Sequence, residues 1–302
     1  MLYDILILGG GPAGLTAATY ARRAGKSVLV IEKNAFGGQI TWSPRVENFP
    51  GYLSVSGVEL GDKLLEQAME QGAETELEEV VGVRFEAGRW TVLCESDVQF
   101  EAKALILAVG AKPRMLGVER EEELVGSGVC YCAVCDGAFY AGRDVAVCGG
   151  GNSALQDALL LSESCRRVYL VHRRASFRGE QKLMESLKAR ENVEFVLEAR
   201  VMALLGEEEL SGLLLEQNGE RRELPVEGVF VAIGHQPDNA AFAAYMELDK
   251  AGYAASGEDC RTRTPGLFVA GDCRTKTVRQ LTTAAADGAV AALSACEYLD
   301  GI

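Results

Sequence analysis

Two stretches of the chain repeat one hydrophobic pattern, in which an apolar run, a glycine-rich turn and a second apolar run follow each other. The apolar runs cover residues 4–8 and 28–32 in the first stretch and residues 145–148 and 168–172 in the second. In both copies 23 residues separate the first turn glycine from the end of the second run. That interval is the length of a strand, a crossover helix and a parallel strand. The pattern therefore predicts one βαβ unit in each stretch.

Each copy continues with the same two features. Residues 83–100 and 193–215 alternate apolar and polar positions in places, which predicts a small antiparallel meander in each copy. Residues 105–109 and 229–233 are apolar closing strands, which end in the turns at Gly110 and Gly234 and are soon followed by a proline. These closing strands indicate where the chain leaves each domain.

A further apolar strand, residues 267–270, and an alanine-rich helix up to Tyr298 follow the second copy. The second copy needs no extra strand, so we expect this tail to complete the first. The sequence thus predicts an α/β fold with two Rossmann-like dinucleotide-binding domains of the three-layer ββα type. We expect the second domain, residues 116–240, to be inserted into the first, which comprises residues 1–115 and 241–302.

The composition and net charge of the chain argue against some classes of binding partner. The 302 residues are 48% hydrophobic and 25% charged, which is typical of a soluble globular protein. The net charge of −14 argues against binding to nucleic acid or to an anionic membrane surface. We find no apolar run long enough for a spanning helix and no cationic segment before the first strand, so we expect a cytoplasmic protein.

Both glycine-rich turns have the G-x-G-x-x-[GA] spacing, which lets backbone amides and a helix N-terminus approach a pyrophosphate. The first βαβ unit ends in Glu32, an acid that suits a free ribose 2′-hydroxyl, and the second ends in a basic run that suits a 2′-phosphate. We therefore predict an FAD-like dinucleotide in the first domain and an NADPH-like one in the second. The predicted residues are Gly9, Gly11, Pro12, Ala13 and Gly14 in the first turn, Gly149, Gly151, Asn152, Ser153 and Ala154 in the second, and His172, Arg173, Arg174 and Arg178 in the basic segment.

Three of the nine cysteines cluster, and two of them form a C-x-x-C motif, Cys132 to Cys135. A structural zinc site needs four ligands, and the chain offers no second pair at that spacing, so we predict no metal. At the start of a helix such a pair gains thiolate character and can close a disulfide. Asp136 follows at once and could exchange a proton there, although an acid in the first turn of a helix is equally well explained as a stabilising group.

Together these residues resemble the low-molecular-weight thioredoxin reductases, a class of the pyridine nucleotide-disulfide oxidoreductases, over essentially the whole chain. The resemblance rests on several motifs in the same order and spacing. They are the two glycine-rich turns, residues 37–39, 47–51 and 132–137, the basic segment 172–174 with Arg178, and the pairs Gly271-Asp272 and Arg279-Gln280.

The resemblance implies a role for each matched residue. Gly9, Gly11 and Gly14 would hold the FAD pyrophosphate and Glu32 the adenosine ribose, and the flavin half would be contacted by Gly38, Gln39, Asn48, Gly110, Asp272, Arg279 and Gln280. The second turn, with Gly234, and the basic segment would bind NADPH. Cys135 would face the flavin, Cys132 would attack the disulfide of thioredoxin, and Asp136 would donate a proton. Since the dithiol and the NADPH residues share a domain, we expect that domain to rotate between two half-reactions.

Three positions depart from the commonest family pattern. Val134 stands where Thr is frequent, Asn152 where Asp is common, and Cys130 where a small residue such as Ser is usual. Cys130 could form a wrong disulfide with either neighbour. The resemblance also implies a homodimer. Other interpretations are a reductase of the same fold that acts on another thioredoxin-like protein or a peroxiredoxin system, one that takes electrons from ferredoxin, and a flavin-binding redox sensor.

Overall fold

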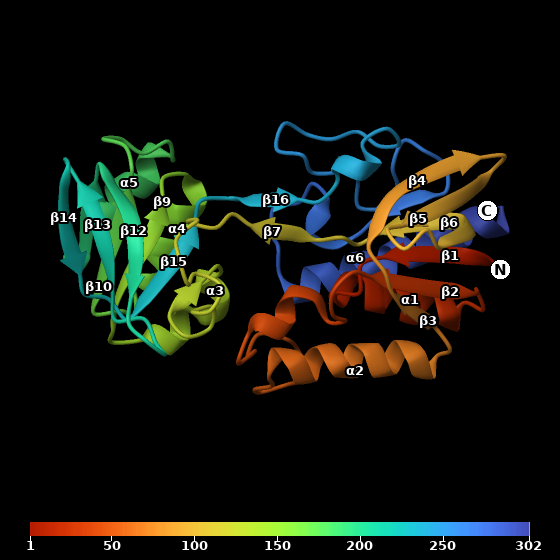
Figure 1. The fold of residues 1–302 in the computed structure, drawn as a ribbon, viewed down its shortest axis with the longest axis horizontal. Coiled ribbons are helices and arrows are strands. Elements are labelled where there is room, and N and C mark those ends of the chain that lie inside the picture. The colour runs from red at the N-terminus through yellow and green to blue at the C-terminus, as the bar shows by residue number, and fades with distance from the viewer. Residues whose placement is uncertain (302) are drawn as a thin grey trace. The chain divides into compact units, whose positions relative to one another are not determined.

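The computed structural model describes residues 1–301, which form two compact units (Figure 1). Unit 1 comprises Met1–Lys112 and the chain from Gln236 onward, and unit 2 comprises Pro113–His235. The chain crosses between them twice, in the short strands β7 (Ala111–Pro113) and β16 (His235–Pro237), which pair with each other.

Unit 1 is built on a mostly parallel sheet. Its strands follow the order β3-β2-β1-β6-β5-β4, and β17 pairs in parallel with β6. The tail strand therefore completes the first sheet, as the sequence predicts. The parallel strands are β1 (Leu2–Leu8), β2 (Val28–Glu32), β3 (Glu74–Leu77), β6 (Gln99–Leu107) and β17 (Leu267–Val269).

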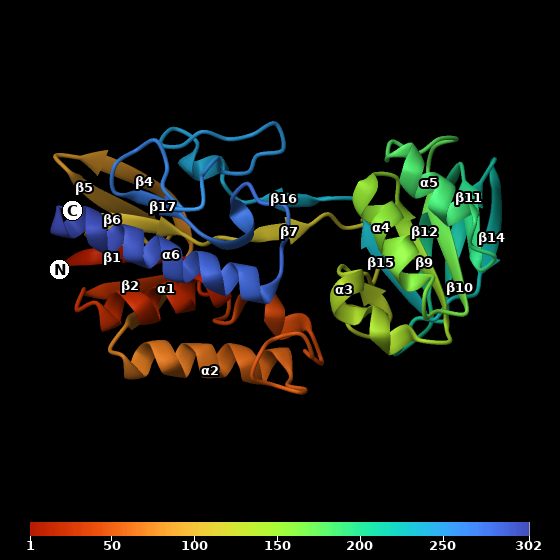
Figure 2. The same cartoon turned by 180° about the vertical axis from the view of Figure 1, so that it is seen from behind.

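Alternate residues of the unit 1 strands enter different layers. Ile5 and Ile7 pack against α1 (Pro12–Arg23) and α6 (Leu281–Asp300), while Leu6 and Leu8 face the antiparallel strands β4 (Val80–Glu86) and β5 (Arg89–Cys94). Because side chains of a strand alternate between faces, an uninterrupted apolar run is what a sheet covered on both sides requires. Figure 2 shows α6 lying along one face of the sheet and α2 (Gly57–Glu70) outside α1.

Unit 2 repeats this plan. Its sheet has the order β11-β10-β9-β15-β8, with one face against α4 (Asn152–Leu161) and the other against an antiparallel sheet, β12-β13-β14. The predicted two-domain α/β fold is confirmed. The strands are β8 (Val129–Cys130), β9 (Asp144–Gly149), β10 (Arg167–His172), β11 (Val193–Leu197), β12 (Ala199–Leu205), β13 (Gly212–Gln217), β14 (Glu220–Leu224) and β15 (Gly228–Ala232), and the remaining helices are α3 (Ala133–Asp136), α5 (Gln181–Lys188), η1 (Gly38–Trp42), η2 (Gly137–Tyr140), η3 (Ala240–Phe242) and η4 (Gly271–Cys273).

One sequence expectation for unit 2 was wrong. Residues 193–215 were expected to form an antiparallel meander, but β11 adds to the parallel sheet by pairing with β10. The meander begins at Ala199 and runs to Leu224. Val196 is fully buried beside β10, so this segment is a core strand despite its partly alternating pattern.

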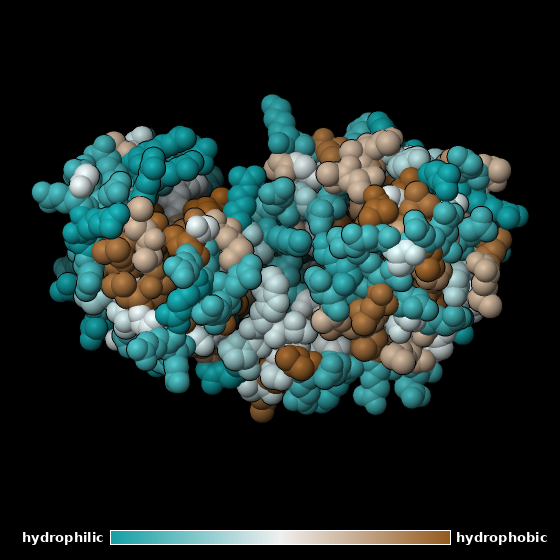
Figure 3. Space-filling view, viewed as in Figure 1, coloured by the Kyte–Doolittle hydropathy of each residue, from teal (hydrophilic) through white to brown (hydrophobic). Residues whose placement is uncertain are grey.

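Hydrophilic residues predominate on the face drawn in Figure 3, and hydrophobic ones form small separate patches. None of the described helices is long and apolar enough to cross a bilayer.

Candidate functional site

The first glycine-rich turn connects β1 to α1 and leaves no room for a side chain at Gly9 or Gly14. A Cβ at Gly9 would lie 2.3 Å from the carbonyl oxygen of Ala108, and one at Gly14 would lie 1.9 Å from that of Gly9. Gly11 caps α1, and Pro12 occupies the first turn of the helix, where a backbone N–H has no helical acceptor. The turn therefore presents backbone amides at a helix N-terminus, which suits a pyrophosphate.

Two further segments lie against this turn. Glu32, at the end of β2, accepts a hydrogen bond from the backbone N–H of Gly10 at 2.7 Å, so its carboxylate is held beside the turn. Gly38 lies so close to Gly11 that a Cβ on it would be 3.1 Å from the Gly11 Cα. The Gln39 amide donates to the carbonyl of Ala111 at 3.1 Å, which brings Gln39 beside Gly110.

The N-terminal end of α6 brings the remaining predicted residues of unit 1 to the same place. Asn48 donates to the side chain of Gln280, the residue that caps α6, at 3.3 Å. Arg279 donates to the backbone oxygen of Asp272 at 3.5 Å. A Cβ on Gly271 would lie 2.9 Å from that of Ala13 in the glycine turn. Contacts thus connect all the segments that were predicted to hold FAD.

Asp272 has unused hydrogen-bonding capacity. Its Oδ1 atom is buried and accepts no hydrogen bond from a described residue, and the nearest cation, Lys276 Nζ, is 3.9 Å away. Burial raises the pKa of this carboxyl, against the opposing charge of Lys276. Since buried polar atoms rarely lack partners, this acceptor fits a hydroxyl-bearing ligand such as the ribityl chain of FAD.

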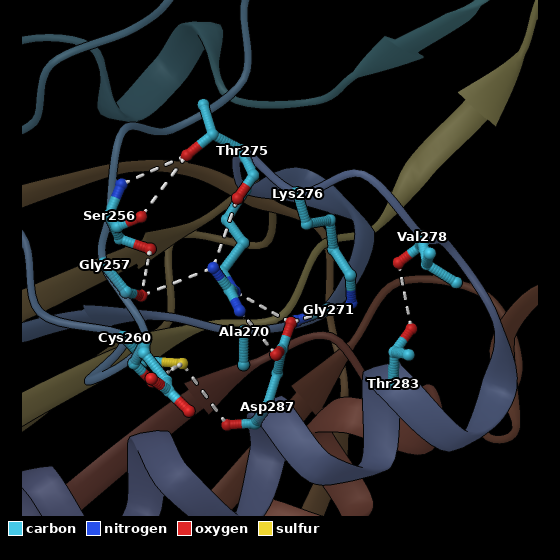
Figure 4. A network of polar contacts seen from close by, with 12 residues as sticks. Ser256, Gly257, Cys260, Ala270, Gly271, Thr275, Lys276, Val278, Thr283 and Asp287 are labelled. Carbon is cyan, nitrogen blue, oxygen red and sulfur yellow. Dashed lines mark hydrogen bonds and ion pairs between the residues drawn. The ribbon is translucent and has the colours of Figure 1, made fainter.

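A buried ionic cluster supports the Gly271-Asp272 turn (Figure 4). Asp287 points from α6 into the loop that carries this turn and accepts hydrogen bonds from the backbone N–H of Gly271 at 3.0 Å and from Lys276 Nζ at 2.9 Å. Arg274 donates to both of its oxygens, at 2.8 and 2.7 Å. Burial alone would raise the pKa of Asp287, but these cationic donors lower it, so the carboxylate is ionised.

The second glycine-rich turn connects β9 to α4 in unit 2. Gly151 caps α4, and a Cβ on it would meet no atom within 4 Å. A Cβ on Gly149 would lie 2.4 Å from the carbonyl oxygen of Ala232, so the turn packs against the end of β15. Ser153 is exposed in the first turn of α4, and Ala154 is buried. This turn has the same form as the first and offers its amides in the same way.

His172 lies beneath the second turn. Its ring is stacked on Phe177 with centroids 5.0 Å apart, and a Cβ on Gly150 would lie 2.1 Å from it. The side chain is buried, and burial together with the charges of Arg174, Arg178 and Arg173 lowers its pKa. A neutral ring in this position supports the turn, whereas the three arginines are exposed and form no ion pair with a described residue.

Gly234 lies after β15, where its carbonyl accepts a hydrogen bond from the backbone N–H of Arg114 at 2.9 Å. Both residues belong to the part of unit 2 next to the chain crossings. Among the described residues, no backbone hydrogen bond connects Gly234 to the glycine turn or to the basic segment.

The C-x-x-C pair forms a disulfide in one helical turn. Cys132 is the N-cap of α3 and is joined to Cys135, with their Cα atoms 5.3 Å apart. The backbone N–H of Cys135 points at the Cys132 sulfur at 3.2 Å, and that of Asp136 donates to the Cys132 carbonyl at 3.0 Å. The Cys135 amide, which faces the sulfur at the start of the helix, favours a thiolate on Cys132 once the disulfide is reduced.

Asp136 follows the disulfide in α3, and burial raises the pKa of its carboxyl to about 6. A carboxylic acid that titrates near neutrality can donate a proton at physiological pH, which an exposed aspartate cannot do.

Cys130 does not join the disulfide. It lies in β8, is buried, and its thiol donates to the Tyr140 hydroxyl at 3.4 Å. Burial raises its pKa to about 12, so it remains a thiol at neutral pH. Cys132 and Cys135 are thus paired with each other, and the wrong pairing that the sequence left open is not formed. No group of three candidate ligands for a metal occurs among residues 1–301.

Several residues that support the site belong to none of the sequence motifs. Asp287 is one, and Glu180, which is hydrogen-bonded to Asn152, is another. A third is Glu121, which is buried and accepts hydrogen bonds from the Leu116 amide and from the hydroxyl of Tyr131, the residue before the dithiol. Asp287 is the only charged residue in the alanine-rich stretch 281–296 of α6, and this sequence signal could have revealed it.

The chain matches the model of the pyridine nucleotide-disulphide oxidoreductase family over residues 3–288. It is similar to a thioredoxin reductase of Listeria monocytogenes, with 40% identity over 99% of this chain and 94% of the relative. A bifunctional thioredoxin reductase/thioredoxin of Mycobacterium leprae is 39% identical over 99% of this chain and 66% of its own length. The crystal structure of a thioredoxin reductase from Streptococcus pyogenes superimposes with a TM-score of 0.94 at 38% identity, over 100% of this chain and 99% of that one.

Proposed function

The chain belongs to the pyridine nucleotide-disulphide oxidoreductase family, and on that basis we propose that it is a thioredoxin reductase that uses NADPH and FAD. The observation that carries this function is the Cys132–Cys135 disulfide, placed at a helix start in the unit that also bears the second glycine turn. The names of the relatives support thioredoxin as the acceptor, and the Mycobacterium leprae relative is a bifunctional thioredoxin reductase/thioredoxin.

Each unit supplies one dinucleotide site in this proposal. In unit 1 the turn Gly9–Gly14 and Glu32 would hold the adenosine half of FAD, and Asp272 would bind the ribityl chain. When bound, FAD supplies the two-electron chemistry that connects a nicotinamide to a disulfide. In unit 2 the second turn would take the pyrophosphate of NADPH, and Arg173, Arg174 and Arg178 its 2′-phosphate.

The dithiol passes two electrons to thioredoxin by exchange of disulfides. The Cys132 thiolate attacks one sulfur of the thioredoxin disulfide, and the other sulfur leaves as a thiolate. Cys135 then attacks Cys132, so the Cys132–Cys135 disulfide re-forms and the second thioredoxin sulfur is released. We expect Asp136 to move a proton at this dithiol, because burial raises the pKa of its carboxyl to about 6. Thioredoxin leaves with both sulfurs reduced.

Unit 2 must present two different groups to unit 1, because the dithiol and the predicted NADPH residues both belong to it. We infer that it turns on the crossings at β7 and β16 between the two half-reactions. As in the reductases that the sequence resembles, we further propose that the protein acts in the cytoplasm as a homodimer.

An anaerobic titration tests the function. We expect one equivalent of NADPH to bleach the flavin absorbance and oxidised thioredoxin to restore it. Bleaching that thioredoxin cannot reverse would keep both cofactors and reject thioredoxin as acceptor. A flavin that NADPH does not bleach would reject the second dinucleotide site and make ferredoxin the donor to test.

Replacement of Arg173 or Arg174 by alanine should impair the use of NADPH selectively. A charge-assisted hydrogen bond contributes about 1.5–3 kcal/mol, so kcat/KM for NADPH should fall about 10- to 150-fold. The value for NADH, which lacks the 2′-phosphate, should change little. Steady-state kinetics with both coenzymes measure this, and an equal loss for the two would contradict a role in phosphate recognition.

Proton transfer by Asp136 should produce a pH dependence. Because burial raises its pKa to about 6, the carboxyl is protonated below that pH and loses its proton above it. The rate of the half-reaction in which Asp136 donates its proton should therefore decline as pH rises through 6. In Asp136→Asn this decline should be missing from the pH–rate profile. Stopped-flow reduction by NADPH from about pH 5 to about pH 8 provides the profile, and an unchanged decline in the variant would assign it to another group.

A further inference from the structure

The residues predicted for the two phosphate groups of NADPH lie on separate segments of unit 2. The glycine turn, residues 149–152, leads into α4, and the arginine loop, residues 173–180, connects β10 to α5 and bears the three arginines. A ligand with both a pyrophosphate and a 2′-phosphate needs these segments at a fixed spacing, since binding otherwise has to restrain a mobile loop. The contacts that set this spacing are therefore of functional interest.

Asn152 and Glu180 connect the two segments through a reciprocal pair of hydrogen bonds. The Asn152 amide nitrogen, Nδ2, donates to Glu180 Oε1 at 2.9 Å, and the backbone N–H of Glu180 donates to Asn152 Oδ1 at 2.8 Å. Both ends of the carboxamide are thus engaged with the arginine loop. Asn152 is the first residue of α4, directly after the turn glycines.

Two other contacts hold the loop at the same place. The backbone N–H of Arg178 donates to the carbonyl oxygen of Gly150 at 2.8 Å. Phe177 is stacked on the His172 ring, which lies under Gly150. The Asn152–Glu180 pair is the part of this attachment made by polar side chains, and it lies next to Arg178.

We propose that Asn152 and Glu180 are positioning residues that lock the arginine loop onto the glycine turn, so that the pyrophosphate and the 2′-phosphate of NADPH meet one preformed surface. The inference rests on the proposed function, because it assumes that NADPH binds in unit 2. It changes the role expected of Asn152, whose side chain acts through Glu180 instead of contacting the coenzyme.

The chemistry of the pair makes the lock sensitive to charge. The Glu180 carboxylate accepts from the Asn152 amide, so the substitution Asn152→Asp would place two carboxylates face to face. The repulsion would open the loop. The double substitution Asn152→Asp with Glu180→Gln would restore one donor and one acceptor with the polarity reversed. This swap keeps the net charge of the protein and therefore separates the local contact from a general effect of charge.

The test is the affinity of the oxidised, FAD-loaded protein for NADP⁺, measured by calorimetry in wild type and four variants. Asn152→Asp should raise the Kd about tenfold, the size of one lost hydrogen bond with added repulsion. The double variant Asn152→Asp with Glu180→Gln should return to within about threefold of wild type, and Glu180→Gln alone should also stay in that range, because its amide oxygen still accepts. Asn152→Asp with Glu185→Gln, a change in α5, has the same net charge as the swap and should remain impaired.

Thermal unfolding of each variant controls for folding. Recovery in the swap and none in the Glu185 control supports the lock. Recovery in both double variants would assign the loss to net charge, and equal impairment in both would assign it to the new carboxylate at position 152. Either result would overturn the proposal, and an unimpaired Asn152→Asp would overturn it as well. A wild-type protein that binds no NADP⁺ would instead contradict the proposed function itself.

Discussion

Replacement of Cys135 by serine is expected to abolish reduction of thioredoxin, to less than about one-thousandth of the wild-type turnover. The disulfide joins Cys135 to Cys132 within a single turn, and no other cysteine among residues 1–301 is paired. A serine cannot resolve the mixed disulfide with thioredoxin or accept electrons as a disulfide. We expect NADPH still to bleach the flavin in this variant, because the predicted dinucleotide residues are untouched.

The buried thiol of Cys130 provides the matched control for this variant. It lies two residues before Cys132, but it donates a hydrogen bond to the Tyr140 hydroxyl and is buried away from solvent. Cys130→Ala removes a neighbouring sulfur without touching the disulfide, and its turnover should stay close to that of wild type. Rapid-reaction spectra followed by a thioredoxin assay separate the two half-reactions. Turnover that survives in Cys135→Ser would overturn the dithiol relay, and loss in both variants would show that Cys130 takes part.

The second large effect concerns stability. Asp287→Ala should lower the free energy of unfolding by about 3–5 kcal/mol, the usual effect of removing one partner from a buried ionic group. The side chains of Arg274 and Lys276 are only 12% and 7% exposed, so without Asp287 they keep their charge and lose their acceptor. The backbone amide of Gly271 would also lose its partner, at the turn that carries Asp272.

An exposed ion pair offers the comparison for Asp287. Glu59 pairs with Lys63 on α2, and their side chains are 55% and 45% exposed, so Glu59→Gln should change stability by less than about 1 kcal/mol. Denaturant unfolding of the two variants measures the difference, and the flavin retained at intermediate denaturant reports whether the turn is affected first. A stability of Asp287→Ala equal to that of Glu59→Gln would mean that the cluster does not stabilise the fold.

The sequence predicted the parts of the molecule that local chemistry determines. Uninterrupted apolar runs such as residues 5–8 can only be buried on both faces, and glycines at Gly9 and Gly14 are required by a backbone approach that leaves no room for a Cβ. The C-x-x-C spacing likewise brought the two sulfurs within bonding reach. The assignment of each site residue to FAD or NADPH stays a prediction.

Groups that depend on distant partners were not predicted. Asp287 meets Arg274 only because α6 turns back over η4, and Glu180 meets Asn152 only because a loop folds onto a turn 28 residues earlier. Strand β11 was assigned to the wrong sheet for a similar reason, since its apolar residues fit either a half-buried or a fully buried strand. In each case the pairing is settled by tertiary packing.

The discontinuity of unit 1 has a consequence for the order in which the protein is made. Unit 2 is one continuous segment, so it can fold as soon as its last strand has been synthesised. The first part of unit 1 precedes unit 2 in the chain, yet α1 packs against α6 and β6 against β17, both of which are translated after unit 2. Synthesis of unit 1 thus starts before that of unit 2 and ends after it. During that interval the apolar faces of α1 and β6 lack their covering elements, which makes this stage the one most dependent on protection from aggregation.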